Sequence, residues 1–111
     1  MLSAPNRLRR AEDFSRITKT GYRASSSLLV VYFLATREPP SKVGLIINKS
    51  VGGSVSRHRI ARQMRHLMIN HIQTLPDGTH MVIRVLKQSG DYRLELETIM
   101  IKVAQRVGLR L

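Results

Sequence analysis

The sequence contains no cysteine and no tryptophan, and only 7 of its 111 residues are aspartate or glutamate. Without cysteine, the chain forms neither a disulfide framework nor a thiolate zinc site. No apolar stretch approaches the roughly 20 residues of a membrane-spanning helix. The first ten residues lack the apolar segment of a signal peptide. We therefore expect a cytoplasmic protein with no membrane partner.

The few acidic residues are too scattered for an acid–base or metal site. Glu95 and Glu97 are two residues apart and do not share a helix face. No two histidines form the helical pair with a glutamate that binds zinc in metalloproteases. The glycines at 52 and 53 lack the Gly-Lys-Ser/Thr ending of a phosphate loop. We expect no catalytic residue, no metal ligand and no bound cofactor in the protein itself.

Positive charge is abundant, with 19 lysines and arginines and a formal net charge of +12. No carboxylate lies between Glu38 and Asp77, and four arginines fall within nine residues of that interval: Arg57, Arg59, Arg62 and Arg65. So much like charge opposes compaction of a small domain. The hydrophobic content of 42% is nevertheless that of a globular chain. A polyanionic partner is the simplest explanation, and nucleic acid is the commonest one.

The hydrophobic patterns predict one α+β domain over residues 1–111. Helices are expected over residues 11–18, about 55–73, and after 91; strands are expected over 22–26, 28–35, 42–48 and 79–86. Ser54 or Ser56 is the expected N-cap of the second helix, and the segment 89–91 is expected to cap the last one. The order αβββαβα predicts a sandwich of one sheet backed by helices.

The second helix is predicted to have an apolar face and a basic face. The apolar arc, expected to face the sheet, comprises Ile60, Met64, Leu67, Met68, His71 and Ile72. The opposite arc, about 120° wide by helical periodicity, comprises His58, Arg59, Arg62, Arg65 and His66. Arg57 lies over the apolar side, and we expect it to reach outward from the first turn.

A basic helix face can also be an ordinary solvated surface or bind an anionic membrane. Solvated faces usually mix both signs in i, i+4 pairs, and this one has no acid to pair with. Membrane binding is disfavoured because the opposite face is needed for the core. Arginine grips phosphates bidentately and stacks on bases. The pattern therefore favours nucleic-acid binding.

The segment from Lys42 to Arg65 resembles the signature of the bacterial ribonuclease P protein subunit. That signature is a strand ending in Val-Gly-Leu, a lysine-bearing loop, and Gly-x-Ala-Val-x-Arg-Asn-Arg-x-Lys-Arg-x-x-Arg. The opening from Asn6 to Phe14, followed by Gly21, resembles the family's start, and the element order matches. Four positions depart from the pattern: His58 stands for Asn, Ala61 for Lys, Ser50 for a second loop Lys, and Thr18 for an aromatic residue.

The resemblance implies a ribonucleoprotein, in which a catalytic RNA carries the active site and its Mg²⁺ ions and removes the 5′ leader of precursor tRNA. It also implies a left-handed βαβ crossover around the arginine helix and one protein copy per RNA. The implied contacts to the catalytic RNA are Lys49, Arg57, His58, Arg59, Arg62 and Arg65. The implied contacts to the leader are Phe14 and Tyr32, because flat rings stack on single-stranded bases.

Two other functions are compatible with a basic α+β domain. One is a non-catalytic RNA-binding protein of ribosomal type, and the other is a DNA-binding regulator with residues 54–73 as its recognition helix. The arginine signature favours ribonuclease P, and the strand before the arginine helix disfavours a helix-turn-helix and DNA. For Phe14, core packing and leader contact remain equally open. Tyr32 favours the cleft, because a phenol needs a polar outlet.

Overall fold

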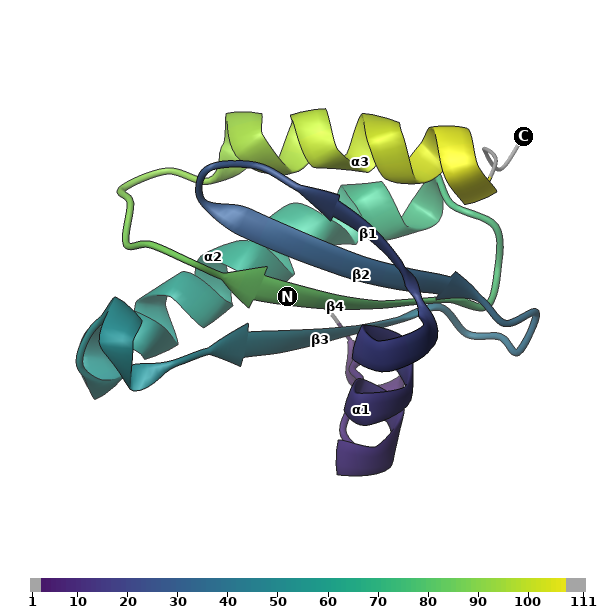
Figure 1. The fold of residues 1–111 in the computed structure, drawn as a ribbon, viewed down its shortest axis with the longest axis horizontal. Coiled ribbons are helices and arrows are strands. Elements are labelled where there is room, and N and C mark those ends of the chain that lie inside the picture. The colour runs from purple at the N-terminus through teal and green to yellow at the C-terminus, as the bar shows by residue number, and fades with distance from the viewer. Residues whose placement is uncertain (1–2, 108–111) are drawn as a thin grey trace.

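The computed structural model describes residues 3–107, and it confirms the predicted order of helices and strands (Figure 1). The helices are α1 (Ala11–Thr20), α2 (Ser54–Gln73) and α3 (Arg93–Val107). The strands are β1 (Tyr22–Ser25), β2 (Leu29–Ala35), β3 (Lys42–Ile47) and β4 (Thr79–Val85). Two short 3-10 helices, η1 (Ala4–Asn6) and η2 (Lys49–Val51), precede the first helix and α2. No helix within residues 3–107 is long and apolar enough to cross a membrane.

The four strands form one sheet in the order β1-β2-β4-β3. β2 is antiparallel to both of its neighbours, whereas β3 and β4 are parallel and are joined by α2. In Figure 1, β3 lies below β4, both arrows point left, and α2 passes behind the sheet. The crossover is therefore left-handed, as the family resemblance implies, although nearly all such crossovers are right-handed.

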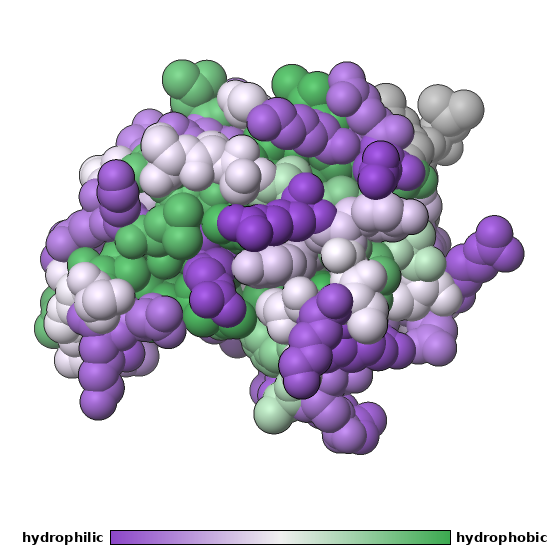
Figure 2. Space-filling view, in the orientation of Figure 1, coloured by the Kyte–Doolittle hydropathy of each residue, from purple (hydrophilic) through white to green (hydrophobic). Residues whose placement is uncertain are grey.

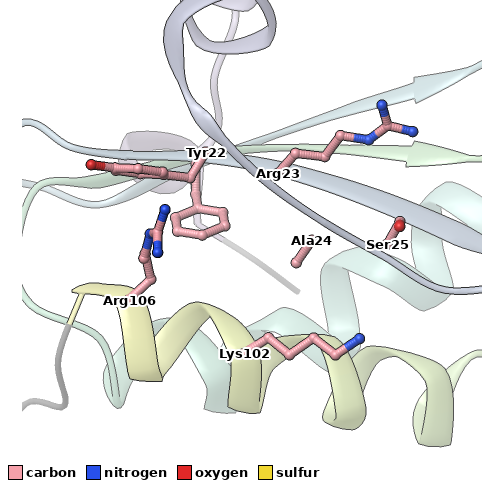
Figure 3. Close-up of a pocket in the computed structure, with 7 residues that line it drawn as sticks. Tyr22, Arg23, Ala24, Ser25, Lys102 and Arg106 are labelled. Atoms are coloured by element: carbon pink, nitrogen blue, oxygen red, sulfur yellow. The ribbon is translucent and has the colours of Figure 1, made fainter.

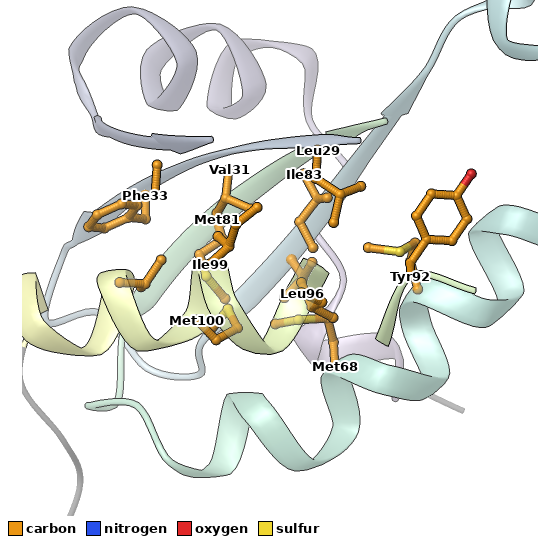
Figure 4. Packing of buried hydrophobic residues seen from close by; sticks show 14 of the residues in the cluster. Leu29, Val31, Phe33, Met68, Met81, Ile83, Tyr92, Leu96, Ile99 and Met100 are labelled. Atoms are coloured by element: carbon orange, nitrogen blue, oxygen red, sulfur yellow. The ribbon is translucent and has the colours of Figure 1, made fainter. Parts of the chain in front are cut away.

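The main core lies between the sheet and the pair α2 and α3. Figure 4 shows Leu29, Val31 and Ile83 of the sheet pointing toward Leu96 and Ile99 of α3. The predicted apolar arc of α2 is confirmed: its fully or nearly fully buried members are Ile60, Met64, Met68 and Ile72, and Leu67 and His71 are half-buried at its margin. Two helices thus close this face of the sheet.

The opposite face of the sheet is covered only in part, because α1 is short. Ile17 of α1 is fully buried against Leu8 and Val82. Phe14, Tyr32, Leu34 and Ile46 lie around this small cluster and are half-buried. Figure 2 shows this face, on which apolar patches lie between hydrophilic side chains. An aromatic and apolar surface therefore remains open beside α1.

The predicted N-cap of α2 is wrong. Ser54 is the first helical residue and Gly53 is the N-cap, with no side-chain hydrogen bond capping this helix start. The Gly53 backbone is extended, with φ −70° and ψ 176°, and its carbonyl accepts the first helical hydrogen bond from the Arg57 N–H. At α3 the predicted cap is present, since the Asp91 carboxylate accepts a hydrogen bond from the Arg93 N–H at 2.9 Å.

Candidate RNA-binding site

The basic residues of α2 lie on two sides of the helix rather than on one arc. Arg57, His58 and Arg65 line a groove of about 320 Å³ between α2 and the edge strand β3. Arg59 and Arg62, together with His66, are exposed on the outer side of the helix. The division arises because α2 packs beside an edge strand, so that one flank of the helix faces open space next to β3.

Arg57 lies at the start of the helix, but its side chain is half-buried and turns back toward the preceding loop instead of reaching outward. Its Nε donates a hydrogen bond to the Gly52 carbonyl at 3.2 Å, which uses one of the five donors of the guanidinium. Lys49 lies just before this point in η2 and is exposed. The first turn of α2 contains no acidic residue, and the helix dipole adds partial positive charge there. This end of α2 therefore favours phosphate.

Arg7 lies close enough to Arg65 to act on its charge, and the sequence patterns did not predict this proximity. The segment before α1 runs beside β3, where Arg7 bridges to Val43 and the Leu8 N–H donates to the Val43 carbonyl at 2.9 Å. Burial lowers the pKa of Arg65, and the nearby positive charge of Arg7 lowers it further. Two cations brought together in this way favour an anionic partner.

Phe14 and Tyr32 lie on the open face of the sheet, on either side of Val82. A Cβ atom at Gly44 would lie 2.4 Å from two ring atoms of Phe14, so the ring rests directly on that glycine. Tyr32 and Gly44 are the register partners of Val82 on its two sides. Both aromatic side chains are half-buried. Each therefore packs with one part of its ring and exposes another.

Arg84 lies on the same face of the sheet, beside Tyr32. Its guanidinium carbon lies 6.0 Å from the centroid of the Tyr32 ring. Its Nε is buried and has no hydrogen-bond partner among the described residues, which is unusual for a buried polar atom. The alternation of residues 79–86 places Arg84 opposite the core, but only the structure brings it to Tyr32. The guanidinium therefore adds a positive charge beside the Tyr32 ring.

Thr18, where the family often has a second aromatic residue, adds no ring to this face. Its hydroxyl donates to the Phe14 carbonyl at 2.9 Å, within α1. In the part of the chain that the structure describes, no three His, Asp or Glu side chains could hold a metal ion. The side chains described above, on α2 and on the open face of the sheet, are cations and aromatic rings, which bind phosphates and bases.

The sequence matches the family model for Ribonuclease P over residues 2–107. The chain belongs to the ribonuclease P protein family. It is 39% identical over 100 residues to the ribonuclease P protein component of Streptomyces avermitilis, covering 82% of this chain and 81% of that protein. It is 45% identical over 89 residues to that of Mycobacterium tuberculosis, covering 80% and 77%.

Solved structures of this family share the fold. The chain resembles the Staphylococcus aureus RNase P protein with a TM-score of 0.79 at 22% identity, covering 93% of this chain and 98% of that one. For the Thermotoga maritima RNase P protein the TM-score is 0.65 at 23% identity, covering 91% and 94%. Family membership implies an RNA partner in a ribonucleoprotein, and RNA binding and tRNA processing fit it. It decides against the ribosomal and DNA-binding alternatives.

Proposed function

We propose that the protein binds the catalytic RNA of ribonuclease P through one surface and the 5′ leader of precursor tRNA through another. The arginine surface comprises Lys49, Arg57, His58, Arg59, Arg62 and Arg65. The leader face comprises Phe14, Tyr32 and Arg84. The observation that carries the proposal is their separation: the arginines lie along α2, behind the sheet, and the aromatic residues lie on the opposite face beside α1.

The arginine surface suits a structured RNA because it offers many phosphate contacts. Arg59 and Arg62 are exposed, and the ion pair between Arg10 and Glu12 lies outside this surface. Guanidinium groups free of carboxylates can each grip a phosphate bidentately. Binding of this kind releases counterions and depends strongly on salt.

The leader face suits a single strand because any base can stack on an aromatic ring. Tyr32 and Phe14 supply the rings, and Arg84 supplies a cation beside them. A paired RNA helix buries its bases and offers nothing for such rings to stack on. The leader is the unpaired part of precursor tRNA, so that stacking distinguishes the precursor from the mature product.

The active site and its Mg²⁺ ions belong to the RNA in this proposal. Mg²⁺ prefers oxygen ligands from carboxylates and phosphates, whereas the two surfaces of the protein consist of cations and aromatic rings. The protein therefore assists cleavage by binding and orienting the substrate. One copy acts with one RNA in the cytoplasm, where precursor tRNA is processed.

The test is reconstitution with a bacterial catalytic P RNA at low magnesium, using precursor and mature tRNA as ligands. We expect cleavage from the complex and none from the protein alone. Tyr32→Ala is expected to weaken binding of the precursor about tenfold, since stacking contributes about 1–3 kcal/mol per base and 1.4 kcal/mol is a factor of ten. Tyr32→Phe keeps the ring and is the matched control.

Mature tRNA has no leader, so its affinity for the Tyr32→Ala complex should remain at the wild-type value. An equal loss on precursor and mature tRNA would show that Tyr32 only supports the fold. Correct 5′ maturation by RNA-free protein, persisting through further purification, would refute the placement of the active site on the RNA.

A further inference from the structure

A second basic groove lies at the edge of the sheet farthest from the arginine surface. It lies between β1 and α3, has a volume of about 400 Å³, and is lined by Tyr22, Arg23, Ser25, Phe33, Lys102 and Arg106, with Ala24 at its base (Figure 3). Three of these residues are cations and none is an acid. β1 is an edge strand, so nothing in the sheet lies beyond it.

An aromatic and a guanidinium are stacked in this groove. The Arg106 guanidinium carbon lies 4.3 Å from the centroid of the Tyr22 ring, and Tyr22 packs against Phe33 with ring centroids 5.8 Å apart. Tyr22 is nevertheless 51% exposed. Stacking on the ring orients the guanidinium while its N–H groups remain at the rim. The pair thus presents a base-stacking surface beside a phosphate-binding group.

Arg23 connects this groove to the leader face. It is the register partner of Tyr32, so the two side chains lie on the same face of the sheet with Cβ atoms about 4.5–5.5 Å apart. In Figure 3 the Arg23 side chain points away from α3, whereas Arg106 lies against Tyr22. Cations therefore continue from Tyr32, around the edge of β1, to Tyr22 and Arg106.

The strand order sets the direction in which a leader would cross the sheet. The arginine surface borders β3 at one edge, and the groove borders β1 at the other. In the proposed function the catalytic RNA carries the active site and binds the arginine surface, which places the cleavage site on the β3 side. Nucleotides progressively farther upstream then pass Phe14, Tyr32 and finally β1.

We propose that the upstream part of the leader, after passing Tyr32, turns over the β1 edge and occupies this groove. Its phosphates contact Arg23, Lys102 and Arg106, and one base stacks on Tyr22. The proposal rests on the proposed function of the leader face. It assigns to this edge of the protein the recognition of leader length, which the Phe14 and Tyr32 contacts alone do not supply.

The experiment measures holoenzyme affinity for precursor tRNAs whose leaders are lengthened one nucleotide at a time. The affinity of the wild-type holoenzyme should increase in two steps. The first step occurs when the leader is long enough to reach Tyr32, and the second when it is long enough to reach Tyr22. Arg106→Ala should abolish the second increase in affinity. We expect that increase to be about tenfold, the contribution of one stacked and phosphate-bound nucleotide. The substitution should also reduce the salt slope by about 0.7 for long leaders only.

Arg93→Ala is the matched control, because it removes the same charge from the opposite end of α3, where Arg93 is also exposed. Tyr22→Leu tests the ring while keeping apolar contact with Phe33, with thermal unfolding as the check on folding. If Arg106→Ala weakens mature tRNA and all precursors equally, the groove contacts the catalytic RNA and the proposal is wrong. It is equally wrong if no ligand is affected.

Tyr32→Ala separates this proposal from the proposed function. If Tyr32→Ala weakens binding of precursor tRNA but not of mature tRNA, while Arg106→Ala changes neither, only the path over β1 is wrong. If Tyr32→Ala also treats precursor and mature tRNA alike, the leader face itself is wrongly assigned.

Discussion

Replacing Gly44 with alanine is expected to lift the Phe14 ring from the sheet. The new Cβ would lie 2.4 Å from both Cε1 and Cζ of Phe14, and 3.1 Å from the Leu8 Cβ. Carbon atoms in contact are about 3.5–4.0 Å apart, so the ring must retreat by about 1 Å or more. The backbone of β3 cannot retreat instead, because β3 is paired with β4 along its whole length.

The expected cost follows from two opposing terms. Overpacking of this kind destabilises a core by about 1–3 kcal/mol, whereas alanine in a strand regains about 0.5–1 kcal/mol of the conformational entropy that glycine loses. The two ranges leave a net loss of about 0–2.5 kcal/mol, together with weaker stacking of the leader on the displaced ring. Affinity for precursor tRNA should fall by up to about tenfold.

Denaturant unfolding and holoenzyme binding of precursor and mature tRNA measure the two effects. Gly90→Ala is the matched control, since a Cβ there would meet nothing within 4 Å. In a Phe14→Ala background the cost of Gly44→Ala should largely disappear, because the clashing ring is absent. Equal costs of Gly44→Ala with and without Phe14 would refute the contact on which the reasoning depends.

Three further expectations concern the arginine surface and the folded state. Arg62→Ala should weaken binding to the catalytic RNA and reduce the magnitude of the log–log salt slope by about 1; an unchanged slope in a folded variant would contradict a phosphate contact. Tyr92→Phe should destabilise the fold by about 1–2 kcal/mol, measured by denaturant unfolding, because the buried hydroxyl donates to the Lys87 carbonyl and accepts from the Ser89 N–H, both at 2.9 Å. Burial lowers the pKa of His71 below its ordinary 6.5, and attraction to Glu97 offsets this only in part. The unfolded chain therefore binds the extra proton, so that stability is full above about pH 6.5 and falls as pH drops below it. The free energy of unfolding, measured across pH, should lose this decline in the His71→Gln variant. Identical pH profiles for the variant and the wild type would contradict the role of His71.

The elements themselves could be predicted because helix and strand periods are local. The apolar spacing from Ile60 to Ile72 determines which side of α2 is buried, whatever the helix packs against. The alternation in residues 79–85 likewise separates Met81 from Arg84 across the sheet. The N-cap was mispredicted because a glycine adopted the extended backbone that a serine was expected to supply.

The candidate site could be predicted only where its residues are close in the chain. The arginines from Arg57 to Arg65 lie on successive turns of a single helix, so the sequence alone predicted that they share it. Arg7 and Arg84 were not identified as partners, because each reaches its neighbour through a sheet contact between distant segments. The Tyr22 and Arg106 stack has the same origin, since β1 and α3 come from opposite ends of the chain.

The sequence alone determined the charge, the two faces of α2 and the order of the elements, since each depends on composition or on neighbours within a few turns. The tertiary structure decided the hand of the crossover, the division of the arginines by β3 and the open face beside α1. These features depend on which strands pair and on which side a helix crosses. Such choices arise from packing between distant segments, for which local periodicity carries no information.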